Sequence, residues 1–170
     1  MPNNNAMLNE ELLRLAKEAG GLAARRGAVL SSAESCTGGL VAAALTHWPG
    51  SSRWFGRGFV CYSNEAKTEM LQVPPPLLRE FGAVSEQTAA AMCAGAGDFS
   101  MSITGIAGPS GGNGEKPAGT VCFAWRAGGA TKTETHYFKG VREKVRLQAA
   151  CHALREITKM LKEIPAKTPE

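Results

Sequence analysis

The chain has 170 residues, 44% of them hydrophobic and 20% charged, and a formal net charge of +4. This size and composition predict one soluble globular domain, and the mild charge, without a basic run, suits an anionic small molecule and argues against a nucleic-acid partner. No apolar span of about 18 residues and no charged leader is present, so we expect a cytoplasmic protein with no membrane contact.

We expect a single domain at 9–164, preceded by a disordered segment at 1–8 and followed by a frayed tail at 165–170. Apolar residues then recur at helical spacing and predict a first helix. Asn9 is its predicted N-cap, and Gly27 is predicted to end it.

The segments that follow predict strands in alternation with helices. The strands are expected at 28–33, 57–62 and 99–104, and the helices at 38–47, 64–71, 77–81 and 86–96. Two further strands, at 120–126 and 133–138, flank Gly128-Gly129 and predict an antiparallel hairpin, and an amphipathic helix at 141–163 closes the chain. This order is typical of the α/β class. We predict a single three-layer α/β/α domain with a mixed, mostly parallel sheet.

The segment Ala33–Gly39 joins a predicted strand to a predicted helix. A serine at such a junction lies beside unpaired N–H groups at the positive end of the helix dipole, where a nucleophile can attack a carbonyl and nearby donors can receive the oxyanion. Ser35 or Thr37 could equally serve only as a helix cap. Cys36 is a rival nucleophile, because a thiol is intrinsically stronger. We favour Ser35, since adjacent side chains point to different sides.

Lys67 is the candidate general base, because no His–Asp pair lies near these motifs and a neutral lysine can activate a serine. Its pKa, ordinarily about 10.4, would have to be lowered by burial or by a cationic neighbour. Tyr62 follows an apolar run and could relay a proton or orient the lysine. The simpler alternatives are a solvated lysine and a tyrosine that belongs to the core.

Backbone donors supply the other candidate binding groups. The N–H groups of the turn after Ser35 are candidate oxyanion donors, and those of the glycine-rich loop after the third strand could cradle a phosphate or ribose. That loop matches neither the nucleoside-triphosphate loop nor the dinucleotide fingerprint, so it could also be only a long turn. The residues concerned are Cys36, Thr37, Gly38 and Gly39 in the turn, and Thr104, Gly105, Ala107 and Gly108 in the loop.

Six blocks in the same order resemble the carboxy-terminal domain of the CinA family, whose stand-alone PncC-type members are nicotinamide-nucleotide amidohydrolases. No amino-terminal CinA domain accompanies them here, so we expect the stand-alone form. The resemblance implies a Ser–Tyr–Lys set at Ser35, Tyr62 and Lys67, a pyridine nucleotide as partner, and deamidation of nicotinamide mononucleotide to nicotinate mononucleotide and ammonia in pyridine-nucleotide salvage. We also expect a homo-oligomer. The blocks are 33–39, 49–52, 62–67, 82–86, 104–109 and 116–120.

The chain departs from the family after the last strand, where it has Gly140-Val141-Arg142 in place of the usual Gly-Asp-Arg. Arg142 remains and Arg146 follows one turn later, so the two could clamp a phosphate or could simply form surface ion pairs. The lost carboxylate could have fixed the arginine or capped the helix. Val141 also keeps a second hypothesis open, a nucleotide-binding or partner-binding module that has lost turnover.

The five cysteines are scattered and form no Cys-x-x-Cys pair, so we expect free thiols, several of them in the core, and a reducing compartment. The three histidines, His47, His136 and His152, lie far apart in the sequence without metal-ligand spacing. We therefore predict no metal site and no cofactor.

Overall fold

The computed structural model describes residues 8–166, so the predictions for 1–7 and 167–170 lie outside the described residues. Every predicted helix and strand is present, with ends that shift by up to three residues. A short 3-10 helix, η1, was not predicted. The elements are α1 (Glu10–Arg26), β1 (Leu30–Glu34), α2 (Leu40–Thr46), η1 (Ser51–Arg53), β2 (Phe55–Val60), α3 (Asn64–Leu71), α4 (Pro75–Phe81), α5 (Glu86–Ala96), β3 (Ser100–Gly105), β4 (Thr120–Ala127), β5 (Ala130–Tyr137) and α6 (Arg142–Glu163).

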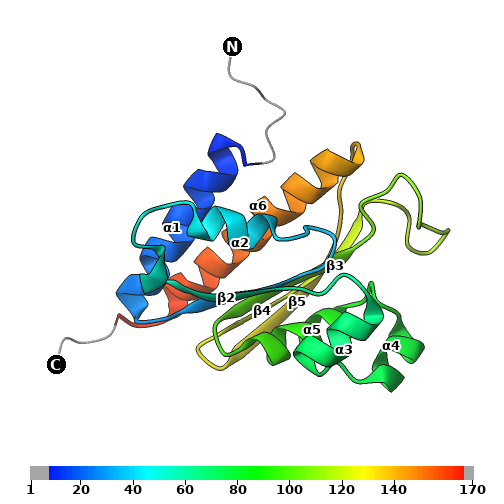
Figure 1. Cartoon of the computed structure of the whole chain (residues 1–170), viewed down its shortest axis with the longest axis horizontal. Coiled ribbons are helices and arrows are strands. Elements are labelled where there is room, and N and C mark those ends of the chain that lie inside the picture. The colour runs from blue at the N-terminus through cyan, green and yellow to red at the C-terminus, as the bar shows by residue number, and fades with distance from the viewer. Residues whose placement is uncertain (1–7, 167–170) are drawn as a thin grey trace, which may run out of the picture.

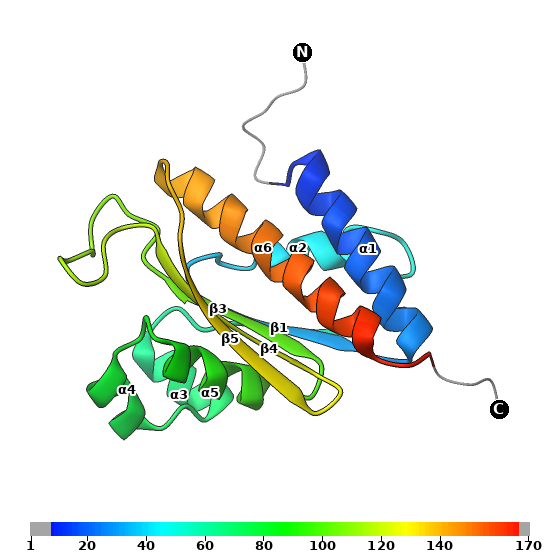
Figure 2. The same ribbon diagram turned by 180° about the vertical axis from the view of Figure 1, so that it is seen from behind.

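The helices form two layers on a five-stranded sheet. Helices α1, α2 and α6 cover one face, and α3, α4 and α5 cover the other (Figure 1, Figure 2). The strand order is β2-β1-β3-β4-β5, with β1 parallel to β2 and β3, and β4 antiparallel to β3 and β5. Four strands therefore run in one direction and only β4 opposes them. This confirms the three-layer α/β/α domain and its mixed sheet.

Helix ends follow from local polar residues. Asn9 Oδ1 accepts the N–H of Leu12 at the start of α1, and Ser85 Oγ accepts the N–H of Thr88 at the start of α5. Each bond satisfies a donor that the first helical turn leaves free. Gly27 ends α1 with a φ of 66°, in the left-handed region that glycine enters without strain. The predicted N-cap at Asn9 and the predicted end of α1 at Gly27 are confirmed.

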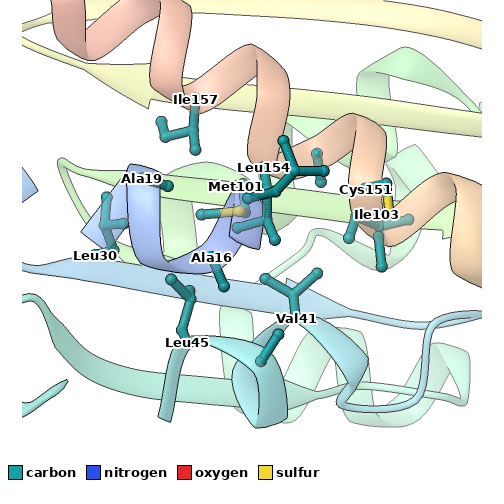
Figure 3. Packing of buried hydrophobic residues seen from close by; sticks show 14 of the residues in the cluster. Ala16, Ala19, Leu30, Val41, Leu45, Met101, Ile103, Cys151, Leu154 and Ile157 are labelled. Atoms are coloured by element: carbon teal, nitrogen blue, oxygen red, sulfur yellow. The ribbon is translucent and has the colours of Figure 1, made fainter. Parts of the chain in front are cut away.

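Strand β3 shows how side-chain alternation builds the two faces. Met101 and Ile103 join the core that packs against α1, α2 and α6 (Figure 3). Ser100 and Ser102 point to the opposite face, where their hydroxyls donate to backbone carbonyls of α5, at 2.8 Å and 2.6 Å. Small polar residues on this face therefore bring α5 close to the sheet. Helices α5 and α3 also pack closely, because a Cβ on Gly95 of α5 would collide with the backbone of α3.

The topology places a crevice at the carboxyl end of β1. From β1 the chain passes through α2 to β2 on one side, and it returns through α3–α5 to β3 on the other side. In open α/β sheets, ligands bind where the strand order reverses in this way, outside the carboxyl ends of the strands. The turn at 35–39 and the loop that follows β3 both begin at this point.

All five cysteines are free, as predicted, and all five are buried, although only several were expected in the core. Within residues 8–166, no helix is both long enough and apolar enough to cross a bilayer.

Candidate active site

Ser35 lies directly after β1, at the crevice, and only 7% of it is exposed. Its N–H donates to the carbonyl of Ile103, which extends the β1–β3 pairing by one residue. The chain then turns through Gly38 and Gly39, whose φ values of 59° and 97° lie in the left-handed region. Glycine is suited to both positions, because a side chain there would strain the backbone.

Lys67 meets Ser35 although the two residues lie on separate elements. Its Nζ lies 3.3 Å from Ser35 Oγ, and the residue is 1% exposed. Burial lowers the pKa of Lys67 from its ordinary 10.5, because the charged form loses its hydration. The alternative of a solvated lysine is therefore wrong.

The three contacts of Lys67 Nζ suit a neutral amine as well as an ammonium group, which would donate to all three acceptors. Besides Ser35 Oγ, its Nζ reaches the carbonyl oxygens of Cys61 at 3.1 Å and Tyr62 at 3.4 Å. A neutral amine has two N–H donors for the two carbonyls and a lone pair that can accept the hydroxyl proton of Ser35. No carboxylate in the described part of the chain forms an ion pair with Lys67. The surroundings thus favour the basic form.

Tyr62 is 63% exposed, so the alternative of a core tyrosine is wrong. Its hydroxyl accepts a hydrogen bond from Arg142 at 3.2 Å, and its backbone carbonyl accepts one from Lys67. Within residues 8–166, the phenol forms no hydrogen bond with Lys67 or Ser35. Tyr62 therefore contacts the lysine through its backbone carbonyl, and its roles in orienting the lysine and in relaying a proton stay predictions.

A cavity of about 350 Å³ opens onto the Ser35–Lys67 pair. Besides Ser35 and Lys67, its lining includes these residues of the predicted site: Cys36, Tyr62, Thr104, Gly105, Ala107, Gly108 and Arg142. Thr37, Gly38 and Gly39 do not line it. Ile106 and Gly111 also line it, and both belong to the glycine-rich loop that was expected to cradle a phosphate or ribose. Sequence reasoning assigned no role to four further lining residues, although some lie in the blocks of the family resemblance: Asn64, Ala83, Val84 and Ser110.

Two larger hollows lie elsewhere, one of about 540 Å³ between α3 and α4 and one of about 580 Å³ beside α1. Neither contains a serine or a cysteine among its lining residues, and no buried lysine lines them. Because an acyl-transfer site needs a nucleophile beside a base, the smaller cavity is the candidate active site.

The turn after Ser35 provides the candidate oxyanion donors. The N–H of Gly38 donates to the carbonyl of Ser35 at 3.0 Å and is therefore engaged. The N–H groups of Cys36 and Thr37 have no acceptor among residues 8–166. Since Cys36 also lines the cavity, its N–H is the leading candidate for the oxyanion.

The side chain of Cys36 is a weak candidate nucleophile in this setting. The residue is 4% exposed, and burial raises the pKa of its thiol to about 12. The thiolate is the nucleophilic form of cysteine, so at neutral pH Cys36 is held in its unreactive form.

Glu34 is a functional residue that sequence reasoning missed. Its carboxylate is fully buried and accepts four hydrogen bonds. Two come from the N–H groups of Val41 and Ala42 in the first turn of α2, at 2.9 Å and 3.0 Å, and two from the hydroxyls of Ser32 and Thr37, at 3.1 Å and 2.8 Å. This carboxylate replaces the missing side-chain cap of α2 and joins both arms of the turn around Ser35. The signal was an acidic residue at the end of a buried strand, just before a helix.

We expect Glu34→Gln to lower the free energy of unfolding by about 2–4 kcal/mol, because its NH₂ group would face donors. Urea denaturation measures the change. Glu65→Gln is the matched control, since Glu65 lies in the first turn of α3 but is exposed, and it should cost less than about 1 kcal/mol. Equal losses in the two variants would contradict the role assigned to Glu34.

Two arginines of α6 hold the rim of the site. Arg146 donates to the carbonyls of Cys36 at 3.0 Å and Thr37 at 3.2 Å, and Arg142 donates to the carbonyl of Gly108 at 2.9 Å. Within 8–166 neither forms an ion pair, so the alternative of surface ion pairs is wrong. Arg146 fixes the turn, whereas Arg142 stays exposed at the cavity mouth.

Val141 occupies the N-cap position of α6 and makes no side-chain cap bond. Arg142 is already held by Gly108 and Tyr62. Of the two roles considered for the family aspartate, the position of Val141 therefore favours capping of α6 over fixing of Arg142.

A family model described as the CinA C-terminal domain matches residues 12–161, and the chain belongs to this family. The nicotinamide-nucleotide amidohydrolase PncC of Escherichia coli K12 is 47% identical over 159 residues, which cover 89% of this chain and 95% of that protein. A Symbiobacterium thermophilum protein named for competence and damage induction is 51% identical over 161 residues, but this chain spans only 38% of its length. The crystal structure of the competence/damage inducible protein CihA from Agrobacterium tumefaciens superposes with a TM-score of 0.86, at 41% identity, over 93% of this chain and 99% of that one.

Proposed function

We propose that this protein is a serine amidohydrolase that converts nicotinamide mononucleotide to nicotinate mononucleotide and ammonia, in pyridine-nucleotide salvage. The observation that carries the proposal is the 3.3 Å approach of buried Lys67 to Ser35 Oγ inside a cavity. The substrate is proposed from the similarity to PncC of Escherichia coli, which is named for that activity.

In the proposed reaction, neutral Lys67 takes the proton of Ser35, and Oγ attacks the carboxamide carbon. The N–H of Cys36 receives the developing oxyanion. Collapse of the tetrahedral intermediate breaks the C–N bond, the Lys67 ammonium returns its proton to the leaving nitrogen, and ammonia departs from an acyl-enzyme. Water, activated by Lys67, then attacks the ester, and the nicotinate product leaves with Ser35 restored.

The charge of the cavity suits a nucleotide monophosphate. Its lining includes the cation Arg142 at the mouth and no acidic residue among the described residues. The glycines of the loop after β3 leave backbone groups accessible to a phosphate or ribose. Because the lining contains no histidine, aspartate or glutamate, Lys67 is the general base in the proposed reaction.

The test is ammonia release by the full chain from nicotinamide mononucleotide, with a chelator present and the nucleotide product followed by chromatography. We expect turnover of the mononucleotide and far slower release from nicotinamide riboside and nicotinamide, which lack the phosphate. No release by folded protein would overturn the proposal. Tight binding without turnover would favour the alternative that Val141 motivates, a binding module. Self-association into a homo-oligomer remains a prediction.

A further inference from the structure

A second cluster of titratable side chains lies outside the cavity, between β5 and α6. Glu134 and His136 alternate along β5 and so share a face, and His152 approaches them from α6. Glu134 Oε1 lies 2.7 Å from His136 Nε2 and 3.1 Å from His152 Nε2. One ligand atom from each residue lies within 4.8 Å of the others. His136 and His152 are distant in the sequence but are neighbours in the fold. Their sequence spacing therefore no longer argues against a metal site.

The cluster is fixed in place by aromatic packing. The His152 ring contacts Phe123, Trp125 and Phe138 at centroid distances of 4.9, 5.8 and 6.1 Å, and His136 stacks on Phe138 at 5.2 Å. The side chain of His152 is only 14% exposed. These contacts hold both imidazoles in position before a ligand arrives, which lowers the entropic cost of binding.

The nearby lysine contacts one carboxylate oxygen of Glu134, and the two histidines contact the other. Lys132 Nζ lies 3.4 Å from Glu134 Oε2, but it pairs more closely with Glu156 Oε2, at 2.7 Å. Glu156 also pairs with Lys159. Oε1 of Glu134, between the two Nε2 atoms, therefore remains available as an anionic ligand.

We propose that Glu134, His136 and His152 bind a divalent transition-metal ion of the Zn²⁺ type. Two imidazole nitrogens, one carboxylate oxygen and a water complete a tetrahedral set that this ion accepts, whereas Mg²⁺ and Ca²⁺ require oxygen ligands. The ion would join edge strand β5 to α6. His152 lies about 15 Å along α6 from Arg142, at about 1.5 Å per residue, so this site is separate from the Ser35 cavity.

Equilibrium dialysis of the chelator-treated full chain against Zn²⁺ at neutral pH tests the proposal. We expect about one bound ion per chain, and binding at least about tenfold weaker in His136→Ala and in Glu134→Gln. His47→Ala is the matched control, because His47 packs beside Trp48 on another part of the fold, and it should bind as the wild type does. Mg²⁺ should not compete.

Two readouts separate this site from other sources of metal binding. Zn²⁺ at about a hundred times its Kd should raise the melting temperature of the wild type by about 5–10 °C and that of His136→Ala by much less. Bound Co²⁺ should show ligand-field bands without thiolate charge transfer, because the ligands are nitrogen and oxygen. A thiolate band, or equal Zn²⁺ binding by wild type, His136→Ala and Glu134→Gln, would overturn the proposal. The absence of Zn²⁺ binding by the wild type would also overturn it, and the three side chains would then form only a hydrogen-bonded cluster.

Discussion

Ser35→Ala should lower kcat for amide hydrolysis by at least about a thousandfold, equivalent to about 4 kcal/mol in the activation barrier. The hydroxyl is the only group proposed to bond to the carboxamide carbon, and the remaining groups can bind the substrate but cannot form an acyl-enzyme. Folding should be little affected, because the change removes one oxygen at the end of a strand. Ammonia release measures the loss. Quenched wild-type turnover analysed by intact-mass spectrometry should show an acyl adduct that the variant lacks.

Two controls accompany this prediction. Ser52→Ala changes an exposed serine of η1 and should retain full activity. Cys36→Ala keeps the backbone N–H proposed as oxyanion donor and should retain most of the activity. Activity that survives in Ser35→Ala but disappears in Cys36→Ala would instead assign the nucleophile to the cysteine.

Lys67→Met should lower kcat by about 10²–10⁴-fold, the usual contribution of a general base, while the protein stays folded. Methionine resembles the lysine stem in length but has no amine to take the proton of Ser35. Lys139→Met, at an exposed lysine of no proposed function, is the control and should leave kcat unchanged. Full activity in Lys67→Met would contradict the assignment of Lys67 as the base.

The lowered pKa of Lys67 adds two pH signatures to this prediction. The wild-type kcat/KM should rise with pH as the amine loses its proton, with an apparent pKa below 10.5, and Lys67→Met should lack that rise. Stability changes in the same direction. Between the folded pKa and the unfolded value of 10.5, the unfolded chain binds more protons, so wild-type stability rises with pH across this window. At neutral pH, Lys67→Met should therefore be as stable as the wild type or more stable.

The order and type of the elements could be predicted from the sequence because their signals are local. Apolar spacing, the ends of α1 at Asn9 and Gly27, and the glycine pair of the hairpin each act within a few residues. The Ser35–Lys67 pair could also be expected, since Ser35 directly follows β1 and Lys67 lies in α3, the helix that begins just beyond β2, and a parallel sheet brings the carboxyl ends of these two strands to one edge.

Other features depend on where side chains meet across the fold, and local patterns do not encode this. The position of Glu34 before a helix was a local signal, but its role as the cap of α2 follows only from the reach of its carboxylate to both Val41 and Ala42. Arg146 was predicted as a phosphate ligand or an ion-pair partner, yet it binds backbone carbonyls of the turn. The approach of His136 to His152 likewise requires α6 to dock on β3 and β4, beside which β5 lies.

The contact between Arg146 and the turn after Ser35 also determines when the site can be completed during synthesis of the chain. Ser35 and Lys67 both emerge in the first half of the chain, but the guanidinium that holds their turn lies 109 and 110 residues after the carbonyls it binds. A nascent chain that has emerged only as far as α3 lacks this support. The site is therefore complete only after the last helix has left the ribosome and docked, so a prematurely terminated chain would carry the serine and the lysine without the arginine that fixes their geometry.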